Sequence, residues 1–526
     1  MTETNQAPTY GKLNRTHPEY DADLWTRLEL LHVGGWQIKK NAALFLPQAP
    51  RENANYYQWR LKATSYVNYF AKLVGYLTGS LFTETLTVTP ATNPKTDEPT
   101  ANPDSFYSAF ATDCDRKGTD FSQFMRQILA SAMVKRRALV AVDMPPLPDG
   151  APEPSNRAES DALGIGRAYL CELPLDALIN WEVDERGRFL WCVLKRKVWQ
   201  RESPLAPQSS FVVEFRVWAM INGAAAITVL RTRTVTKDEE LRPDEPLTVV
   251  KPTRQTSFRE IPILDLELPE ALWVGNQAGP LCEEHYRRRS DLIGALCRSL
   301  VEIPYVKLGP EIPEVHGGIS EAQSDPNRGR GVLERARQGE AVQLGAEDSI
   351  GYAGPSGVSF ELASKELVGL REEIFGSVNA MALQLENSAA AVGRSGESKA
   401  EDRSSLGIIL GFLSVHVREF SQRVMQLVSE ARGEELQWVA SGLNTFDADD
   451  RSQILEEAVM LQTLNVPSRR FRVLAQIKLA TAILPNATAK QKAEIAREIE
   501  RNNTGHDDYD PFQDRSPSHQ HEEDLA

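Results

Sequence analysis

The fold of this chain is decided by residues 359–385, which read SFELASKELVGLREEIFGSVNAMALQL. Their apolar side chains recur every three or four residues, at Ala363, Leu367, Leu370, Ile374, Val378, Met381 and Leu385. This spacing puts them on one narrow stripe of a helix. At a rise of about 1.5 Å per residue the helix is about 40 Å long. Because its flanks are polar, the stripe predicts a rod that packs lengthwise against a partner.

Two more long helices are predicted on either side of this one. Residues 280–300 carry a stripe at Arg289, Ile293, Leu296 and Leu300. Residues 400–431 carry another at Leu406, Ile409, Leu413, Val417, Phe420, Val424 and Leu427. A segment rich in Gly, Pro and Glu, residues 304–355, precedes the central helix, and a segment of small residues, 388–398, follows it. Both intervening segments favour loops or small mixed structure.

The first half mixes helices and strands. Helices are expected around residues 24–31, over 52–81 and over 105–134, the last broken at Gly118 with Thr119 as the N-cap of its second part. A buried strand is expected over residues 139–144. Strands also fill residues 168–253, separated by turns at 184–187 and 222–223, which favours antiparallel hairpins. The fold class is therefore α+β.

The last part of the chain is predicted to be helical and then polar. Short helices are expected over residues 451–464, 468–479 and 487–501. From about residue 505 the sequence is rich in His, Asp and Glu and has too little apolar surface to fold, so we expect a disordered tail.

Composition excludes several classes of protein. The chain has 526 residues, 41% hydrophobic residues and a net charge of -14. That length predicts several substructures. No apolar run is long enough to span a bilayer and the first residues are polar, so we expect neither a membrane protein nor a secretory signal. The charge argues against tight, static DNA binding, which needs clustered cations.

No motif in the sequence carries catalysis. There is no phosphate-binding loop, no HExxH zinc motif and no GxSxG nucleophile elbow. The 5 cysteines include no CxxC pair, and the 8 histidines are scattered. We therefore expect no catalytic residue, no cofactor and no metal site, and a chain that is not an enzyme.

Two arginine clusters have alternative interpretations. Arg287, Arg288 and Arg289 could face phosphates, but Glu283, Glu284 and Asp291 lie within one turn and favour an ion-paired, solvated helix face. Arg328, Arg330, Arg335 and Arg337 could contact a nucleic acid or a partner protein. Pairing of these four with Glu334 and Glu340 is equally compatible with the sequence.

Several segments, taken in order, resemble the portal proteins of tailed bacteriophages. They are THPEY at residues 16–20, GYLTGSLF at 75–82, DCDRKGTDFSQF at 113–124, LVAVDMP at 139–145, INW at 179–181, IPI at 261–263, HYR at 285–287, SD at 290–291 and the helical block 464–500. No single motif is a signature. The ordered set, which covers most of the chain, carries the resemblance.

The resemblance implies a portal fold, with parts called wing, stem, clip and crown. The wing would comprise a helical part, residues 1–104, and an α/β part, residues 105–277. Residues 278–301 and 359–387 would be the two stem helices, with the clip, residues 302–358, between them. Residues 388–399 would form a tunnel loop, 400–435 a long wing helix, 436–504 an all-α crown and 505–526 the disordered tail.

The resemblance also implies site residues. The tunnel loop would narrow a DNA channel with Ser388, Val392, Arg394, Ser395 and Lys399. On composition alone Arg394 and Lys399 belong to an ordinary mobile loop, and Glu397 and Glu401 argue against a charged DNA clamp. The contact between stem helices of neighbouring subunits would use Leu367, Leu370, Ile374, Val378, Met381, Ile293 and Leu296. The clip would contact partners through Arg328, Arg330 and Arg335.

The implied function is that of a virion structural protein. About twelve subunits would form a ring at one capsid vertex, through which double-stranded DNA is packaged and ejected. The partners would be the large terminase, a head-completion or adaptor protein, and the major capsid and scaffolding proteins. Assembly would take place in the host cytoplasm. The alternatives are another structural protein of the virion, from the tail or the capsid interior, and, with less support, an enzyme.

Overall fold

The computed structural model describes residues 8–91, 105–145, 159–160, 163–201, 203, 210–236, 239–299, 303–307, 334, 349–353, 357–388, 398–443, 473, 476–477 and 495–499. The chain divides into two compact units, Met1–Asn444 and Thr445–Ala526. The few described positions of the second unit are helical, and the rest of the predicted crown and the tail lie outside the described residues. All elements named below belong to the first unit.

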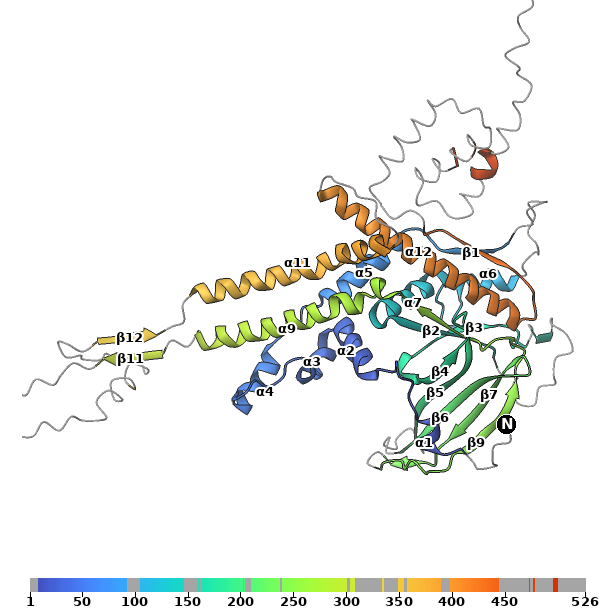
Figure 1. The fold of residues 1–526 in the computed structure, drawn as a ribbon, viewed down its shortest axis with the longest axis horizontal. Coiled ribbons are helices and arrows are strands. Elements are labelled where there is room, and N and C mark those ends of the chain that lie inside the picture. Colours follow the sequence, from blue (N-terminus) through green and yellow to red (C-terminus); the bar gives the residue numbers. More distant parts are fainter. Residues whose placement is uncertain are drawn as a thin grey trace, which may run out of the picture. The chain divides into compact units, whose positions relative to one another are not determined.

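Helices and antiparallel sheets together build the first unit, so the expected α+β class is confirmed (Figure 1). The largest sheet has six strands in the order β4-β5-β6-β7-β9, with β8 paired to β6. These strands are β4 (Leu178–Val183), β5 (Phe189–Gln200), β6 (Ser210–Ile221), β7 (Ala224–Arg231), β8 (Val235–Thr236) and β9 (Thr248–Gln255). Every neighbouring pair is antiparallel, as the turn residues predicted.

The turn between β6 and β7 fixes the register of this strand pair. Asn222 and Gly223 have φ angles of 53° and 80°. Two successive positive φ angles are typical of a type I′ turn, which asparagine and glycine adopt at little cost. Ile221 therefore pairs with Ala224, and the register continues to Glu214 opposite Arg231.

The two faces of the six-stranded sheet differ in character. Val213, Phe215 and Leu230 lie in an apolar core on one face, where Tyr10 and Leu13 of helix α1 (Tyr10–Leu13) pack against it. Side chains alternate along a strand, so the neighbours of these residues on β6 point to the other face. That second face carries charged residues.

A smaller sheet joins the large sheet to the helices. It has the order β10-β2-β3, with β2 (Arg137–Asp143) between β3 (Tyr169–Leu173) and β10 (Ile263–Glu267). Helices α6 (Ser105–Thr112) and α7 (Phe121–Lys135) precede β2, with the break near Gly118 that the sequence predicted. Helix α7 packs against β2 and β10.

The predicted cap of α7 is wrong by one residue. Asp120, not Thr119, is the N-cap, and its side chain accepts a hydrogen bond from the backbone N–H of Gln123. The hydroxyl of Thr119 instead donates to Asp115. A carboxylate also interacts favourably with the positive end of the helix dipole.

The N-terminal helices are more numerous than predicted. Helix α2 (Ala22–Val33) is followed by α3 (Gly35–Lys40) and the 3₁₀ helix η1 (Ala42–Leu44). The single run expected over residues 52–81 is two helices, α4 (Ala54–Ala63) and α5 (Tyr69–Leu81). The side chain of Asn68 caps α5 by accepting from the N–H of Ala71, which starts a new helix.

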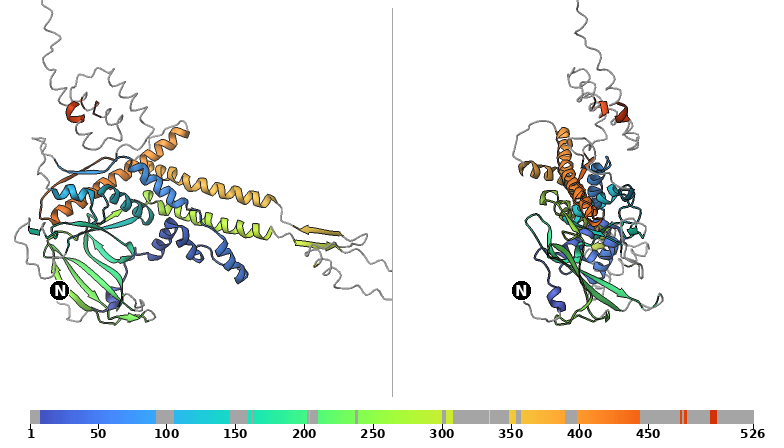
Figure 2. Two further views of the ribbon diagram at one scale, coloured as in Figure 1. Left: turned by 180° about the vertical axis from the view of Figure 1, so that it is seen from behind. Right: turned by 90° about the vertical axis from the view of Figure 1, so that its right-hand side faces the viewer.

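Three long helices make up the rest of the first unit. They are α9 (Val274–Ser299), which follows the 3₁₀ helix η3 (Glu270–Leu272), α11 (Gly357–Ser388) and α12 (Ser398–Ala431). Helices α9 and α11 lie side by side in all views (Figures 1 and 2). All three were predicted, although α9 begins before the expected residue 278. No helix in the described ranges is both long enough and apolar enough to cross a membrane.

Two short strand pairs complete the unit. Strands β11 (Ile303–Lys307) and β12 (Ser349–Ala353), which lie between α9 and α11 in the sequence, form an antiparallel pair. Strand β1 (Thr87–Pro90) pairs with β13 (Trp438–Ser441). Residues 438–441 were expected to belong to an all-helical crown, so this expectation is corrected: they form a two-stranded sheet with β1.

Candidate functional site

Helices α9 and α11 form an antiparallel pair within the chain. Ile374 and Met381 of α11 are completely buried, and Leu370 and Val378 are nearly so. Polar contacts link the two helices at two places along their length. Arg288 lies 3.1 Å from Glu366, and Gln277 donates to Gln384 at 3.4 Å. The numbering runs in opposite directions along the two helices, so α11 returns beside α9.

This packing corrects the assignment of the apolar stripe to a subunit contact. Four of the predicted interface residues, Leu370, Ile374, Val378 and Met381, are covered by the chain's own helices. Leu367 and Ile293 are half-buried, and Leu296 is exposed. Periodicity identified the buried face correctly, but the partner that covers it is α9 and its neighbours rather than a second chain.

The apolar residues that remain accessible on α11 lie on another side of the helix. Leu362, Val368 and Phe375 are exposed, and Val368 and Phe375 stand one heptad apart on the same side. Phe375 also contacts the ring of Tyr69 of α5, with centroids 5.9 Å apart. This side of α11, which the sequence reading missed, is available to a partner.

A groove of about 760 Å³ runs along this accessible side. Lys72, Arg371 and Glu372 line it next to the rings of Tyr69 and Phe375, and Arg371 lies 3.8 Å from Glu372. The ammonium of Lys72 lies over the Tyr69 ring, 5.5 Å from its centroid. Apolar rings beside cations suit a protein partner that offers aliphatic and acidic side chains.

The arginine cluster of α9 is ion-paired. Arg287 contacts Glu283 and donates to the carbonyl of Phe45 at 2.9 Å, and Arg288 lies 3.5 Å from Glu284. The interpretation as a solvated, paired helix face is confirmed for these two arginines. Arg289 differs, because its Nε is buried without a hydrogen-bond partner.

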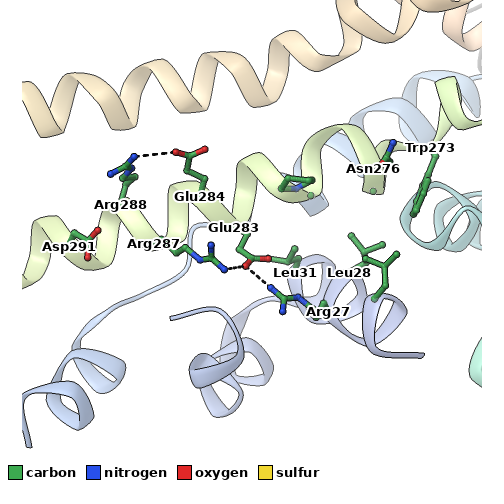
Figure 3. A pocket seen from close by; sticks show the side chains of 14 residues that line it. Arg27, Leu28, Leu31, Trp273, Asn276, Glu283, Glu284, Arg287, Arg288 and Asp291 are labelled. Carbon is green, nitrogen blue, oxygen red and sulfur yellow. Dashed lines mark hydrogen bonds and ion pairs between the residues drawn. The ribbon is translucent and has the colours of Figure 1, made fainter. Parts of the chain in front are cut away.

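A second groove, of about 550 Å³, lies between α2 and α9 (Figure 3). Leu28 and Leu31 of α2 give it an apolar wall. Glu283 points from α9 toward α2 and contacts both Arg27, at 2.6 Å, and Arg287. The groove therefore offers an apolar wall beside paired charges, which suits it to binding.

A buried polar network fixes α4 to α9. The guanidinium of Arg60 binds both carboxylate oxygens of Glu52, at 2.7 and 2.8 Å, and donates to the hydroxyl of Ser290 at 3.1 Å. The hydroxyl of Thr64 reaches Ser290 as well. A buried arginine that binds a carboxylate on one side and a hydroxyl on the other holds the two segments together.

An aromatic junction joins α5 to α9. His285 packs edge-on against Tyr69, with centroids 5.1 Å apart, and Tyr286 packs against Tyr66. Burial lowers the pKa of His285, and the charge of Arg289 lowers it further. His285 Nδ1 and the hydroxyl of Tyr286 are buried and have no hydrogen-bond partner among the described residues. The junction therefore favours a neutral histidine.

Segments that carried the family resemblance meet in a second cluster. The imidazole of His17 stacks on Trp181, with centroids 3.9 Å apart. The guanidinium of Arg137 lies 4.5 Å from the centroid of Trp181 and 2.6 Å from Asp265. Residues 16–20 and 179–181 thus pack together, and Arg137 of β2 and Asp265 of β10 extend this cluster to the smaller sheet.

Several predicted site residues lie outside the described residues. They are the clip residues Arg328, Arg330 and Arg335, and the loop residues Val392, Arg394 and Ser395. Ser388 is the last residue of α11 and Lys399 lies in the first turn of α12. These two positions belong to helices rather than to the expected loop.

The described residues hold no group of three or more His, Cys, Asp or Glu side chains that could bind a metal ion. Burial raises the pKa of the thiols of Cys114 and Cys282 to about 12. Both thiols are therefore protonated at neutral pH and are poor nucleophiles.

No protein-family model matches this chain, and no curated protein matches it.

Proposed function

We propose that this chain is the portal protein of a tailed phage, one subunit of a ring that conducts DNA into and out of the capsid. The observation that carries the proposal is the order of its parts. A region of sheets leads into the long helix α9, the strand pair β11–β12, the returning helix α11 and the third long helix α12. That order fits the wing, stem, clip, stem and wing-helix sequence that the resemblance implies.

The proposal assigns a role to each part. The α9–α11 pair is the stem, and the β11–β12 pair belongs to the clip, which docks the large terminase and later the head-completion or adaptor protein. The role of the tunnel loop beside the DNA falls to residues 388–399, as the resemblance implies. None of these roles involves catalysis.

The accessible surfaces supply the ring contact in this proposal. A ring with rotational symmetry joins two different surfaces of the same chain, head to tail. Val368 and Phe375 lie on one side of α11, and the α2–α9 groove opens on another part of the helix layer. Burying exposed apolar area contributes about 25 cal/mol per Å² to association.

The test is direct imaging of the purified full-length chain. Negative-stain micrographs with rotational averaging are expected to show closed rings with a central hole, of about twelve subunits. Native mass spectrometry gives the subunit count independently. Monomers alone, at every protein concentration tried, would contradict the proposal.

A further inference from the structure

An unusual charge cluster lies on the outer face of the six-stranded sheet. Glu214 of β6 is 2% exposed and contacts three arginines. Arg196 of β5 lies 3.1 Å from it, Arg216 lies 3.0 Å away on the same strand, and Arg231 of β7 lies 2.7 Å away. In the strand register, Arg196 and Arg231 stand directly opposite Glu214 on either side.

One carboxylate does not neutralise this cluster. Burial would raise the pKa of Glu214, but hydrogen bonds from Arg231 and Arg216 hold it below its ordinary value, so it carries a full negative charge. Three guanidiniums around one carboxylate leave an excess of two positive charges. The arginine side chains are 54%, 42% and 40% exposed, so their remaining N–H donors face solvent.

Two further cations extend the cluster along the same face. Lys251 of β9 stands opposite Val229, and Arg254 stands opposite Ile227. The register shifts on either side of Val229, so the two cations stand three residues apart on β9. Directly paired residues share a face of the sheet, and Val229 and Ile227 share theirs with Arg231. We call these five residues the basic face: Arg196, Arg216, Arg231, Lys251 and Arg254. In the described part of the chain, Glu214 is the only carboxylate that pairs with its three central arginines.

Stability of the sheet alone does not account for this arrangement. A single arginine opposite Glu214 would satisfy the carboxylate, and each added guanidinium repels the others. The chain as a whole carries a charge of -14, so a surface with five cations and one acid runs against its composition. Concentrated positive charge of this kind is a feature of surfaces that bind anions.

The chemistry of the face favours phosphodiesters over acidic side chains. Guanidiniums match the oxygens of phosphate with two parallel donors. The grooves between α2 and α9, beside α4 and along α11 are lined by residues of other elements and by none of the five cations. Contacts to a nucleic-acid backbone need only a spread of cations. One aromatic ring, the half-buried Trp218 of β6, shares this face with Arg216, whereas the exposed Trp199 of β5 lies on the opposite face. A single half-buried ring offers little surface for the stacking that binds single strands.

We propose that the basic face binds the phosphate backbone of double-stranded DNA, without sequence preference. Across four neighbouring strands the cations span about 14 Å, since strands lie about 4.8 Å apart. That width covers about eight phosphate charges along a duplex. The inference concerns the sheet and does not depend on the proposed ring or on any channel formed by the helices.

The test measures binding of full-length protein to a fluorescent duplex of about 30 base pairs by anisotropy, between about 50 and 200 mM salt. Arg196→Gln combined with Arg231→Gln is expected to weaken binding about tenfold or more at the lowest salt. It should also reduce the slope of log K against log salt by about 2. Lys251→Gln with Arg254→Gln should act in the same direction, and neither residue forms an ion pair with any of the described residues.

The matched control is Lys195→Gln with Lys197→Gln. These lysines alternate with Arg196 on β5, remove the same charge and point to the opposite face, where Lys195 donates to Asn14 and Lys197 lies over Trp199. Unchanged binding in this control supports the proposal. An equal loss in the lysine control and in Arg196→Gln with Arg231→Gln would overturn it. An unchanged slope of log K against log salt in every variant would overturn it as well. Competition by polyglutamate as effective as that by unlabelled DNA would overturn it in favour of an acidic protein partner.

Discussion

Single buried arginines tie neighbouring elements of this chain together. Arg60 joins α4 to α9 through Glu52 and Ser290, and Arg137 joins β2 to β10 through Asp265. In the second pair both side chains are about one-tenth exposed. A buried ion pair contributes little compared with an apolar pair of the same shape, but removing one partner leaves an uncompensated charge. Removing one partner of a buried ion pair therefore lowers the free energy of unfolding far more than removing one partner of an exposed pair.

Asp265→Asn is therefore expected to lower the free energy of unfolding by about 3 kcal/mol, because Arg137 stays charged and buried. The matched control is Glu267→Gln on the same strand, whose pair with Arg136 is exposed on both sides. That change should cost less than about 1 kcal/mol. Urea unfolding followed by circular dichroism measures both values, and equal losses would show that Arg137 is not held as described.

His285 makes the fold sensitive to acid. Burial, together with the charge of Arg289, lowers its pKa in the folded chain. Burial also lowers the pKa of His32. Below the ordinary histidine pKa of 6.5 the unfolded chain binds protons that the folded chain resists. Stability contributed by these neutral histidines is complete above that pH and is lost as the pH falls.

His285→Gln should therefore flatten the decline of melting temperature between about pH 7.5 and pH 5.5. The readout is the difference in slope between the variant and the parent chain, not the absolute melting temperature, which a lost ring contact with Tyr69 also affects. His32→Gln should act in the same direction. Parallel slopes for all three proteins would mean that neither histidine is held neutral.

At the level of whole elements, periodicity predicted helices better than it predicted their neighbours. The stripe of α11 and the runs of α9 and α12 were all visible in the sequence. A stripe at helical spacing states that one face is buried, but not which surface buries it. Helix α9, which begins far away in sequence, covers the stripe. The break between α4 and α5 was missed because it depends on one capping side chain, Asn68.

The charged clusters also differ in how far they could be predicted from the sequence. The pairing of Arg287 with Glu283 was predictable because a spacing of four residues brings side chains together on any helix. The cluster around Glu214 was not, since it needs the register of three strands. Each hairpin turn fixes a part of that register, and an error of one residue would place the arginines on the opposite face.

Two residues on different sides of α11 provide a test of its packing. Ile374→Ala removes methyl groups from a completely buried position and should cost about 2–5 kcal/mol. Val368→Ala, on the exposed side of the same helix, should change stability by less than about 0.5 kcal/mol. Thermal and urea unfolding of the two variants distinguish the faces. Similar losses would show that α11 is rotated relative to α9.

Two glycines test how closely α9 approaches α7. A Cβ at Gly275 would lie 2.1 Å from the carbonyl oxygen of Val134, which also accepts a hydrogen bond from the indole of Trp273. Gly275→Ala must therefore separate the two helices, and we expect a loss above about 2 kcal/mol. Gly369→Ala is the control, because its Cβ would meet open space on α11. It should stabilise the chain by about 0.5–1 kcal/mol; stabilisation by both changes would contradict the close approach.

For the whole molecule, the negative net charge opposes association between chains, whereas the basic face carries the opposite charge. Each chain carries -14, so identical chains repel one another when they assemble. The accessible side of α11 offers apolar contacts with Val368 and Phe375 that do not depend on charge. The basic face offers contacts that do. The response of assembly to salt therefore reports which kind of contact dominates.

If apolar contacts hold the proposed ring together, salt should promote its assembly. Screening shortens the reach of repulsion between subunits from about 30 Å at about 0.01 M to about 8 Å at about 0.15 M salt, while burial of Phe375 and its neighbours is barely affected. Sedimentation velocity of the full-length chain between those salt concentrations should show the large species gaining at the expense of monomer. Val368→Ser with Phe375→Ser should shift the balance to monomer at every salt concentration. Rings that dissociate as salt rises would instead assign the subunit contact to ion pairs, and would make the cations Lys72 and Arg371 in the α5–α11 groove the first residues to test.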